Sequence, residues 1–348
     1  SGTEGAFVNR KRLLPNTWHE ITRFDEVNIR GAILEISPRI FLGRDRVGID
    51  TQPLYYRLPG GSGRVLCDGA YVRAKPGTLT TIMGPAGCGK TILLNLLSGA
   101  IKPDEGAIIV GERFALDPGY GGVRDYIGYV PQGDEMIPEL TVRQSLHFRL
   151  RLKFPDMDEA VRTRLIRQTC RQLGLAPSRI DQFLDTRIGS SERAGQGLSG
   201  GERKRANIAH ELISKPLILI LDEPTTGLSS VEAAQIVRLL KALAQQELLT
   251  VVTTIHQPGP DVFECIDELI IMMHGGKLAY HGPAARAKGY FERLTGSRCS
   301  SRNPAEYLLE QVFDPDAGAR LVSSFSGARL LYPDLAPPYS GDCQRQPS

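Results

Sequence analysis

The segment TLTTIMGPAGCGKTILLNLLSGA, residues 78–100, decides the fold of this chain. Its apolar, β-branched start at 78–83 predicts a buried strand, and the apolar pattern that follows the loop predicts a helix. Glycines between the two let the backbone curl, so that N–H groups and the helix N-terminus point at phosphate oxygens. Strand, loop and helix together predict a P-loop. Its predicted nucleotide-binding residues are Gly84, Pro85, Ala86, Gly87, Cys88, Gly89, Lys90 and Thr91.

Two side chains of this loop have predicted roles in the chemistry. Lys90 places a positive charge at the terminal phosphates, where we expect it to act in catalysis as well as in binding. Thr91 offers a hydroxyl ligand to Mg²⁺. The predicted ligands of this loop are therefore a nucleoside triphosphate and Mg²⁺.

A second motif, LILILDEPTTGL at 217–228, is a hydrophobic strand that ends in two acids. Strand ends of an open α/β sheet face the ligand crevice, so Asp222 and Glu223 are expected beside the nucleotide. Alternation along the strand sends the two carboxylates in different directions. We predict that Asp222 supports Mg²⁺ through water and that Glu223 polarises the attacking water as general base. An acidic helix N-cap is the structural alternative for this pair.

Short apolar runs recur along the chain between helical patterns. They are TLTTIM (78–83), AIIV (107–110), IGYV (127–130), LILIL (217–221), LLTVVTTI (248–255) and ELIIMM (268–273). Buried strands separated by crossover helices predict an α/β fold with a mainly parallel sheet. We expect all six runs to be strands of this P-loop core.

Other segments depart from this alternation. Residues 134–205 show helical spacing among many arginines and predict an inserted helical subdomain, whereas 18–66 predicts an antiparallel β flap. We expect one nucleotide-binding domain over 17–315, an N-terminal extension at 1–16, and a linker or tail at 316–348. Only one GxxxxGK[ST] motif occurs, so the domain holds a single cassette.

Composition narrows the class of protein. The chain has 348 residues, of which 41% are hydrophobic, enough for a full core. Lys and Arg number 42 against 39 Asp and Glu, a balance that excludes the strong positive field on which nucleic-acid binders rely. The six cysteines show no metal-ligand spacing. No apolar run is long enough to cross a bilayer.

A third motif, LSGGE at 198–202 followed by RKR, separates the chain from other P-loop folds. Over about residues 50–312 the chain resembles the nucleotide-binding domain of ATP-binding cassette proteins. Ser199, Gly200 and Gly201 open a helix, which makes a second anion site. The resemblance implies a head-to-tail dimer, in which these residues of one domain close over the nucleotide held by a second nucleotide-binding domain.

The resemblance also implies two further site residues. Gln132 in YVPQGD matches the Q-loop, which touches Mg²⁺ and the attacking water and joins the core to the helical subdomain. His256 in TTIHQP matches the switch histidine that contacts the γ-phosphate. On their own, these residues would be read as a surface glutamine and a structural histidine.

The type of cassette follows from its flanking motifs. GERKRANIAHEL (201–212), TTIHQPGPDVFECIDELIIMMHGGKLAYHG (253–282) and NPAEYLLE (303–310) resemble the G type, the white and pleiotropic-drug-resistance relatives. The resemblance implies an ATPase that powers export of lipids, sterols or drugs, with a transmembrane partner domain and a place on the cytoplasmic face of a membrane. The alternatives are a soluble cassette with a non-transport mechanical role and a P-loop kinase or GTPase.

Three positions depart from the family pattern. Ser229 stands where the D-loop usually has Asp, which removes a charge from the expected dimer interface. Gln144 stands where the group often has Glu, at a point implied to couple to the membrane domain. Tyr56 lies near the adenine-stacking position, and Leu58 is the alternative occupant.

Overall fold

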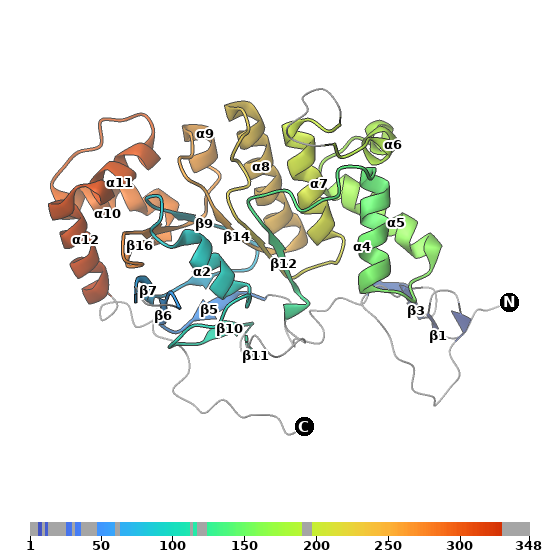
Figure 1. The fold of residues 1–348 in the computed structure, drawn as a ribbon, viewed down its shortest axis with the longest axis horizontal. Coiled ribbons are helices and arrows are strands. Elements are labelled where there is room, and N and C mark those ends of the chain that lie inside the picture. Colours follow the sequence, from blue (N-terminus) through green and yellow to red (C-terminus); the bar gives the residue numbers. More distant parts are fainter. Residues whose placement is uncertain are drawn as a thin grey trace, which may run out of the picture.

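The computed structural model describes residues 6–8, 11–12, 26–29, 32–35, 47–59, 63–111, 114–116, 124–189 and 197–328. Its architecture is α/β, as predicted (Figure 1). The main sheet has six strands in the spatial order β12 (Ile127–Val130), β13 (Ile218–Leu221), β14 (Thr250–Thr254), β9 (Leu79–Met83), β15 (Glu268–Met272) and β16 (Leu278–Pro283). The first five are parallel, and β16 is an antiparallel edge strand. Five of the six predicted runs are thereby confirmed in the parallel sheet.

Each face of this sheet is covered by its own layer. Along β13, Leu219 and Leu221 pack into one hydrophobic cluster, whereas Ile218 and Ile220 pack into another. This alternation follows from the two-residue period of a strand. The first cluster holds α8 (Ser230–Glu247) and the helical subdomain, and the second holds α2 (Lys90–Leu97). All four of these β13 side chains are fully buried, so the strand end that carries the acids is rigidly held.

The predicted helical subdomain is formed by four helices: α4 (Val142–Lys153), α5 (Glu159–Gln172), α6 (Pro177–Asp185) and α7 (Gly200–Leu212). Thr141 caps α4 in a capping box, in which the side chain of Gln144 accepts a hydrogen bond from Thr141 N at 2.9 Å. A glutamine performs this capping role as a glutamate does. The departure at Gln144 thus keeps the start of the helix intact.

The antiparallel part extends beyond the predicted flap. One sheet has the order β11 (Phe114–Ala115), β10 (Ile108–Val110), β5 (Ile49–Thr51) and β8 (Arg73–Ala74), and a hairpin joins β6 (Leu54–Arg57) to β7 (Val65–Ala70). The expectation that 107–110 joins the parallel sheet is wrong, because β10 pairs antiparallel with β5. An apolar run predicts burial but not the sheet in which a strand pairs.

The ends of the chain contain regular elements within the ranges expected to be extensions. A four-stranded sheet has the order β2 (Lys11–Arg12), β1 (Ala6–Val8), β3 (Glu26–Ile29) and β4 (Ala32–Glu35). The remaining residues of 1–16 and residues 329–348 lie outside the described residues.

Four helices complete the C-terminal side: α9 (Pro260–Phe263), α10 (Ala284–Thr295), α11 (Pro304–Phe313) and α12 (Pro315–Ala328). Helix α12 packs on α10 and β16 and buries Leu321 completely. Regular structure therefore continues into the range expected to be a tail. Among the described helices, none combines the length and the apolar character needed to cross a bilayer.

Candidate active site

The loop between β9 and α2 requires its glycines. Gly87 and Gly89 have φ values of +71° and +107°, a region that side chains other than glycine rarely adopt. A Cβ atom on Gly89 would lie 2.3 Å from the carbonyl oxygen of Leu66. Only glycine fits there, so the loop presents bare backbone at the N-terminus of α2. Such a surface binds phosphate oxygens.

Lys90, the first residue of α2, places its charge inside this loop. Its side chain is only 6% exposed, and Nζ donates hydrogen bonds to the carbonyl oxygens of Gly84 and Pro85, both at 2.9 Å. Neutral carbonyls hold the ammonium group in place without cancelling its charge. A buried cation of this kind is stabilised by an anion that enters the loop.

Asp222 is held between two threonine hydroxyls directly after β13. Thr91 Oγ1 donates to its Oδ2 at 2.8 Å, and Thr254 Oγ1 donates to its Oδ1 at 2.6 Å. The carboxylate is 3% exposed. Two of the three predicted Mg²⁺ residues, Thr91 of α2 and Asp222 after β13, are therefore in contact, and the end of β14 fixes the orientation of Asp222.

Glu223 points its carboxylate at the predicted Q-loop. Its Oε2 accepts hydrogen bonds from Gln132 Nε2 and from Thr226 Oγ1, both at 2.9 Å. Its backbone N–H donates to Thr254 Oγ1 at 2.8 Å, and its φ of +44° is unusual for a residue with a side chain. Backbone strain of this kind is retained where the surrounding contacts fix one side-chain direction.

The Q-loop is anchored to helix α7. Lys204 Nζ donates to the carbonyl oxygen of Gln132 at 2.9 Å, and Asn207 donates to Asp134. Burial lowers the pKa of Lys204, an effect opposed by the nearby charges of Asp134 and Glu223. A movement of α7 would therefore be transmitted to Gln132.

The third motif lies at the exposed start of α7. Ser199 caps this helix in a capping box with Glu202, whose Oε2 accepts from Ser199 Oγ at 2.9 Å. Gly200 is exposed and Gly201 is half-buried. Helix α7 packs on β12 and α8, whereas α2 packs on β14 and β7, so the two predicted anion sites belong to different parts of the molecule (Figure 1).

The structure thus joins some of the predicted residues and separates others. Thr91, Asp222, Glu223 and Gln132 form one connected set next to the lysine loop. His256 lies two residues beyond β14 with an exposed side chain, and within the described residues no hydrogen bond connects it to the set. The predicted metal site contains a single carboxylate, and the described residues contain no group of three His, Cys, Asp or Glu placed to hold a metal.

Besides Thr226, which donates to Glu223, two further residues that support the site were not predicted. Thr254 holds both acids, and Lys204 holds the Q-loop. The sequence gives only a weak signal for either role. A threonine in an apolar run predicts a strand residue, and a lysine in RKR predicts a solvent-exposed side chain. Of the two candidates for adenine stacking, Tyr56 packs against the core and Leu58 is 43% exposed. The stacking role stays a prediction.

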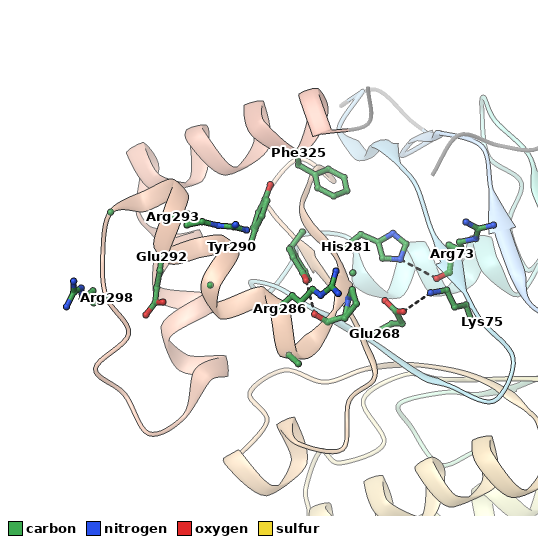
Figure 2. Close-up of a pocket in the computed structure, with 16 residues that line it drawn as sticks. Arg73, Lys75, Glu268, His281, Arg286, Tyr290, Glu292, Arg293, Arg298 and Phe325 are labelled. Atoms are coloured by element: carbon green, nitrogen blue, oxygen red, sulfur yellow. Dashed lines mark hydrogen bonds and ion pairs between the residues drawn. The ribbon is translucent and has the colours of Figure 1, made fainter. Parts of the chain in front are cut away.

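A separate hollow, with a volume of about 1250 Å³, lies between β16, α10 and α12 (Figure 2). In it, His281 Nε2 donates a hydrogen bond to the carbonyl oxygen of Arg73 at 3.2 Å, and Lys75 pairs with Glu268 at 3.1 Å. None of its lining residues belongs to the three motifs. We therefore do not place the nucleotide there.

Comparisons with known proteins identify the motifs. The ABC transporter family matches residues 67–226, and the ABC-2 type transporter family matches residues 256–320. One similar protein is ABC transporter G family member 26 of Arabidopsis thaliana, which is 34% identical over 74% of this chain and 36% of its own length. Another is the broad substrate specificity ATP-binding cassette transporter ABCG2 of Bos taurus, which is 38% identical over 72% of this chain and 36% of its own length.

Protein SNQ2 of Saccharomyces cerevisiae is 36% identical over 72% of this chain and 16% of its own length. The chain therefore spans from about a sixth to just over a third of these relatives. A solved ATP-binding cassette of an ABC transporter, in its ADP conformation, has a TM-score of 0.58 at 21% identity, covering 69% of this chain and 94% of that one. This likeness shows that the fold is shared.

Proposed function

Since this chain is an ATP-binding cassette of the kind carried by G family ABC transporters, we propose that its nucleotide site couples ATP hydrolysis to transport. One observation supports the assignment above the others. Thr91, next to Lys90 in the loop after β9, donates to Asp222 after β13, and Thr254 of the intervening strand β14 contacts both Asp222 and Glu223. Binding, metal support and general-base catalysis thus have separate side chains within one crevice.

Each side chain of the site has a distinct role. The backbone of 84–89 and Lys90 bind the phosphates, and Thr91 and Asp222 would hold Mg²⁺, which neutralises phosphate charge when bound. A site with so few protein ligands is suited to Mg²⁺, because the ion fills its other coordination positions with water molecules and phosphate oxygens of the substrate. Glu223 accepts the proton of the attacking water, and Gln132 orients the same carboxylate. His256 contacts the γ-phosphate once the site has closed.

A second cassette completes the site. The helix start at Ser199, Gly200 and Gly201, of which Gly201 is half-buried, lies apart from the lysine loop of the same chain, and a helix N-terminus favours anions. We propose that two cassettes pair head to tail, each placing this helix start over the nucleotide of the other. Bound ATP then joins the two copies, and hydrolysis releases them.

The cassette acts on a transmembrane domain at the cytoplasmic face of a membrane. The match of 256–320 to the ABC-2 type transporter family and the G family relatives support this partner. The cargo is a lipid-, sterol- or drug-like molecule, since one relative is named for its broad substrate specificity. The alternative, a cassette with a mechanical role apart from transport, keeps the same site chemistry.

Two measurements test these proposals. The chain is mixed with ATP and Mg²⁺, and ATP binding and phosphate release are followed with and without EDTA. We expect Mg²⁺-dependent release of phosphate to water, and loss of ATP binding in Lys90→Ala would support the loop assignment. Phosphate transfer to an acceptor molecule would overturn the ATPase.

The second measurement separates transport from the alternative. Membrane vesicles that contain the full-length gene product are given ATP and a fluorescent lipid or drug-like probe. We expect ATP-dependent movement of the probe that stops in Glu223→Gln. ATP turnover without movement of any such probe would favour the mechanical role.

A further inference from the structure

Two helices that begin side by side carry the same capping arrangement. Ser199 caps helix α7, whose third residue is Glu202. Ser229 caps helix α8, whose third residue is Glu232. The two helices pack on each other. A Cβ atom on Gly200 would lie 3.2 Å from Leu228 Cδ2, so the D-loop touches the first turn of α7. Both helix N-termini are therefore parts of one junction.

The two glutamates of this junction differ in what they touch. Glu202 turns back on its own cap, accepting from Ser199 N and Ser199 Oγ, and it lies 3.7 Å from the Arg179 guanidinium. Glu232 contacts its own cap in the same way, and its other oxygen also lies against the neighbouring helix. Its Oε1 lies 3.3 Å from the position that a Cβ atom of Gly201 would take.

The Glu232 carboxylate is oriented by both helices. Ser229 Oγ donates to its Oε2 at 2.7 Å, and Ser229 N donates to the same atom at 3.1 Å. Hydrogen bonds from the Ser229 hydroxyl and the Ser229 backbone lower the pKa of Glu232, and the nearby Gly201 backbone acts in the same direction. A negative charge of the chain itself therefore rests on the first turn of α7, where a helix favours anions.

We propose that Glu232 is an internal anion at the start of α7, which occupies the place beside Gly201 until the phosphate of a second cassette takes it. The inference rests on the proposed head-to-tail pairing. If the carboxylate stays during closure, it repels the incoming triphosphate; if it leaves, its bonds to Ser229 break. Either way, Glu232 weakens closure and makes it depend on the D-loop to which it is tied.

The test measures ATP-dependent dimerisation of the chain in a Glu223→Gln background, by sedimentation at a series of protein concentrations. Glu232→Gln keeps the capping geometry, because glutamine serves at this position, and removes the charge. Its dimer should be about tenfold tighter with ATP, since two sites per dimer lose a helix-end anion. Glu232→Asp, which keeps the charge, should stay near the parent.

The matched control is Glu247→Gln, which removes the same charge from the opposite end of α8. It lies about 20 Å from Glu232 along the helix axis, beyond a Debye length, and should leave the dimer unchanged. Thermal melting and ATP affinity of the monomer are measured in all variants. These readouts separate loss of folding from a change in closure.

Each outcome has a defined meaning. Equal dimer affinity in Glu232→Gln and Glu247→Gln would overturn the proposed role of Glu232. A weaker dimer in Glu232→Gln than in the parent would also overturn it and would show that Glu232 serves only to cap α8. Failure of the parent to bind ATP would instead contradict the proposed function. ATP binding without a dimer in any variant would contradict both the pairing and the internal anion.

Discussion

The side-chain amide of Gln132 donates a hydrogen bond to Oε2 of Glu223 at 2.9 Å, joining residues that lie 91 positions apart. The register of β12 and β13 brings them together, because Val130 pairs with Leu221 and each residue lies two positions beyond its strand partner. Lys204 of α7 holds the backbone of Gln132. The helical subdomain is thereby connected to the carboxylate that we assign as general base.

Replacing Glu223 by glutamine tests this assignment. The Glu223→Gln side chain still accepts from Gln132 and Thr226 through its amide oxygen, so the site keeps its shape. It cannot take a proton from water, and we expect ATP turnover to fall at least about 100-fold while ATP affinity stays unchanged. Phosphate release and equilibrium binding measure the two quantities. Turnover at the original rate would show that another group is the base.

The tie between Lys204 and the Q-loop gives a second prediction. Lys204→Met keeps the aliphatic stem and removes the donor to the Gln132 carbonyl oxygen. With its anchor lost, Gln132 should orient Glu223 less well, and kcat should fall about 3- to 10-fold with little change in ATP affinity.

The control for this prediction is Lys288→Met, which changes an exposed lysine on α10. It should leave turnover unchanged. If both variants had parent activity, the Lys204 contact would be structural only.

Thr254 provides a third prediction, because one hydroxyl serves both acids. Thr254→Val removes the donor to Asp222 Oδ1 and leaves the Glu223 N–H without its acceptor. A buried polar group without a partner costs about 1–3 kcal/mol of stability. We expect this loss together with weaker Mg²⁺-dependent activity, measured by chemical unfolding and by titration of turnover with Mg²⁺.

A matched control lies on the neighbouring strand β9. The hydroxyl of Thr81 is buried and has no hydrogen-bond partner in the described structure. Thr81→Val should therefore be neutral or slightly stabilising. Comparable losses in both variants would indicate that any change in this layer disturbs the site.

The main features of the fold could be predicted from local patterns. The strands at 78–83 and 217–221 and the loop at 84–89 depend on runs of neighbouring residues, which a sequence displays directly. The antiparallel pairing of β10 with β5 could not be predicted, since it joins Ile109 to Asp50 across a long stretch of chain. Pairing partners are set by tertiary contacts.

The same distinction applies to the site. Asp222 and Glu223 stand at a predicted strand end, and the structure places Asp222 in contact with Thr91. Thr254 comes from a different strand, and its role appears only once β14 lies next to β13. Residues that support a site across strands carry no local motif.

Ser229 leads to a prediction on stability. Its hydroxyl accepts from Glu232 N at 3.3 Å and caps α8, so Ser229→Ala should destabilise the chain by about 1 kcal/mol. Ser230→Ala, one position inside the helix, should cost much less, because alanine is the best helix former. Urea unfolding of both variants measures the difference. Equal stability would show that the cap contributes nothing.

His281 makes stability depend on pH. Burial lowers its pKa from 6.5 to about 4, outweighing its hydrogen bonds to the backbone of Arg73 and Tyr71 (Figure 2). The unfolded chain therefore binds the proton more tightly than the folded chain, and stability is lost as pH falls from about 6.5 towards 4. Protonation of His281 in the unfolded chain therefore lowers the free energy of unfolding by about 2 kcal/mol at pH 5 relative to pH 7. The free energy of unfolding of His281→Gln should change less between pH 7 and pH 5 than that of the parent. The control His274→Gln, at an exposed position, should change as much as the parent. An unchanged pH dependence in His281→Gln would place the titrating group elsewhere.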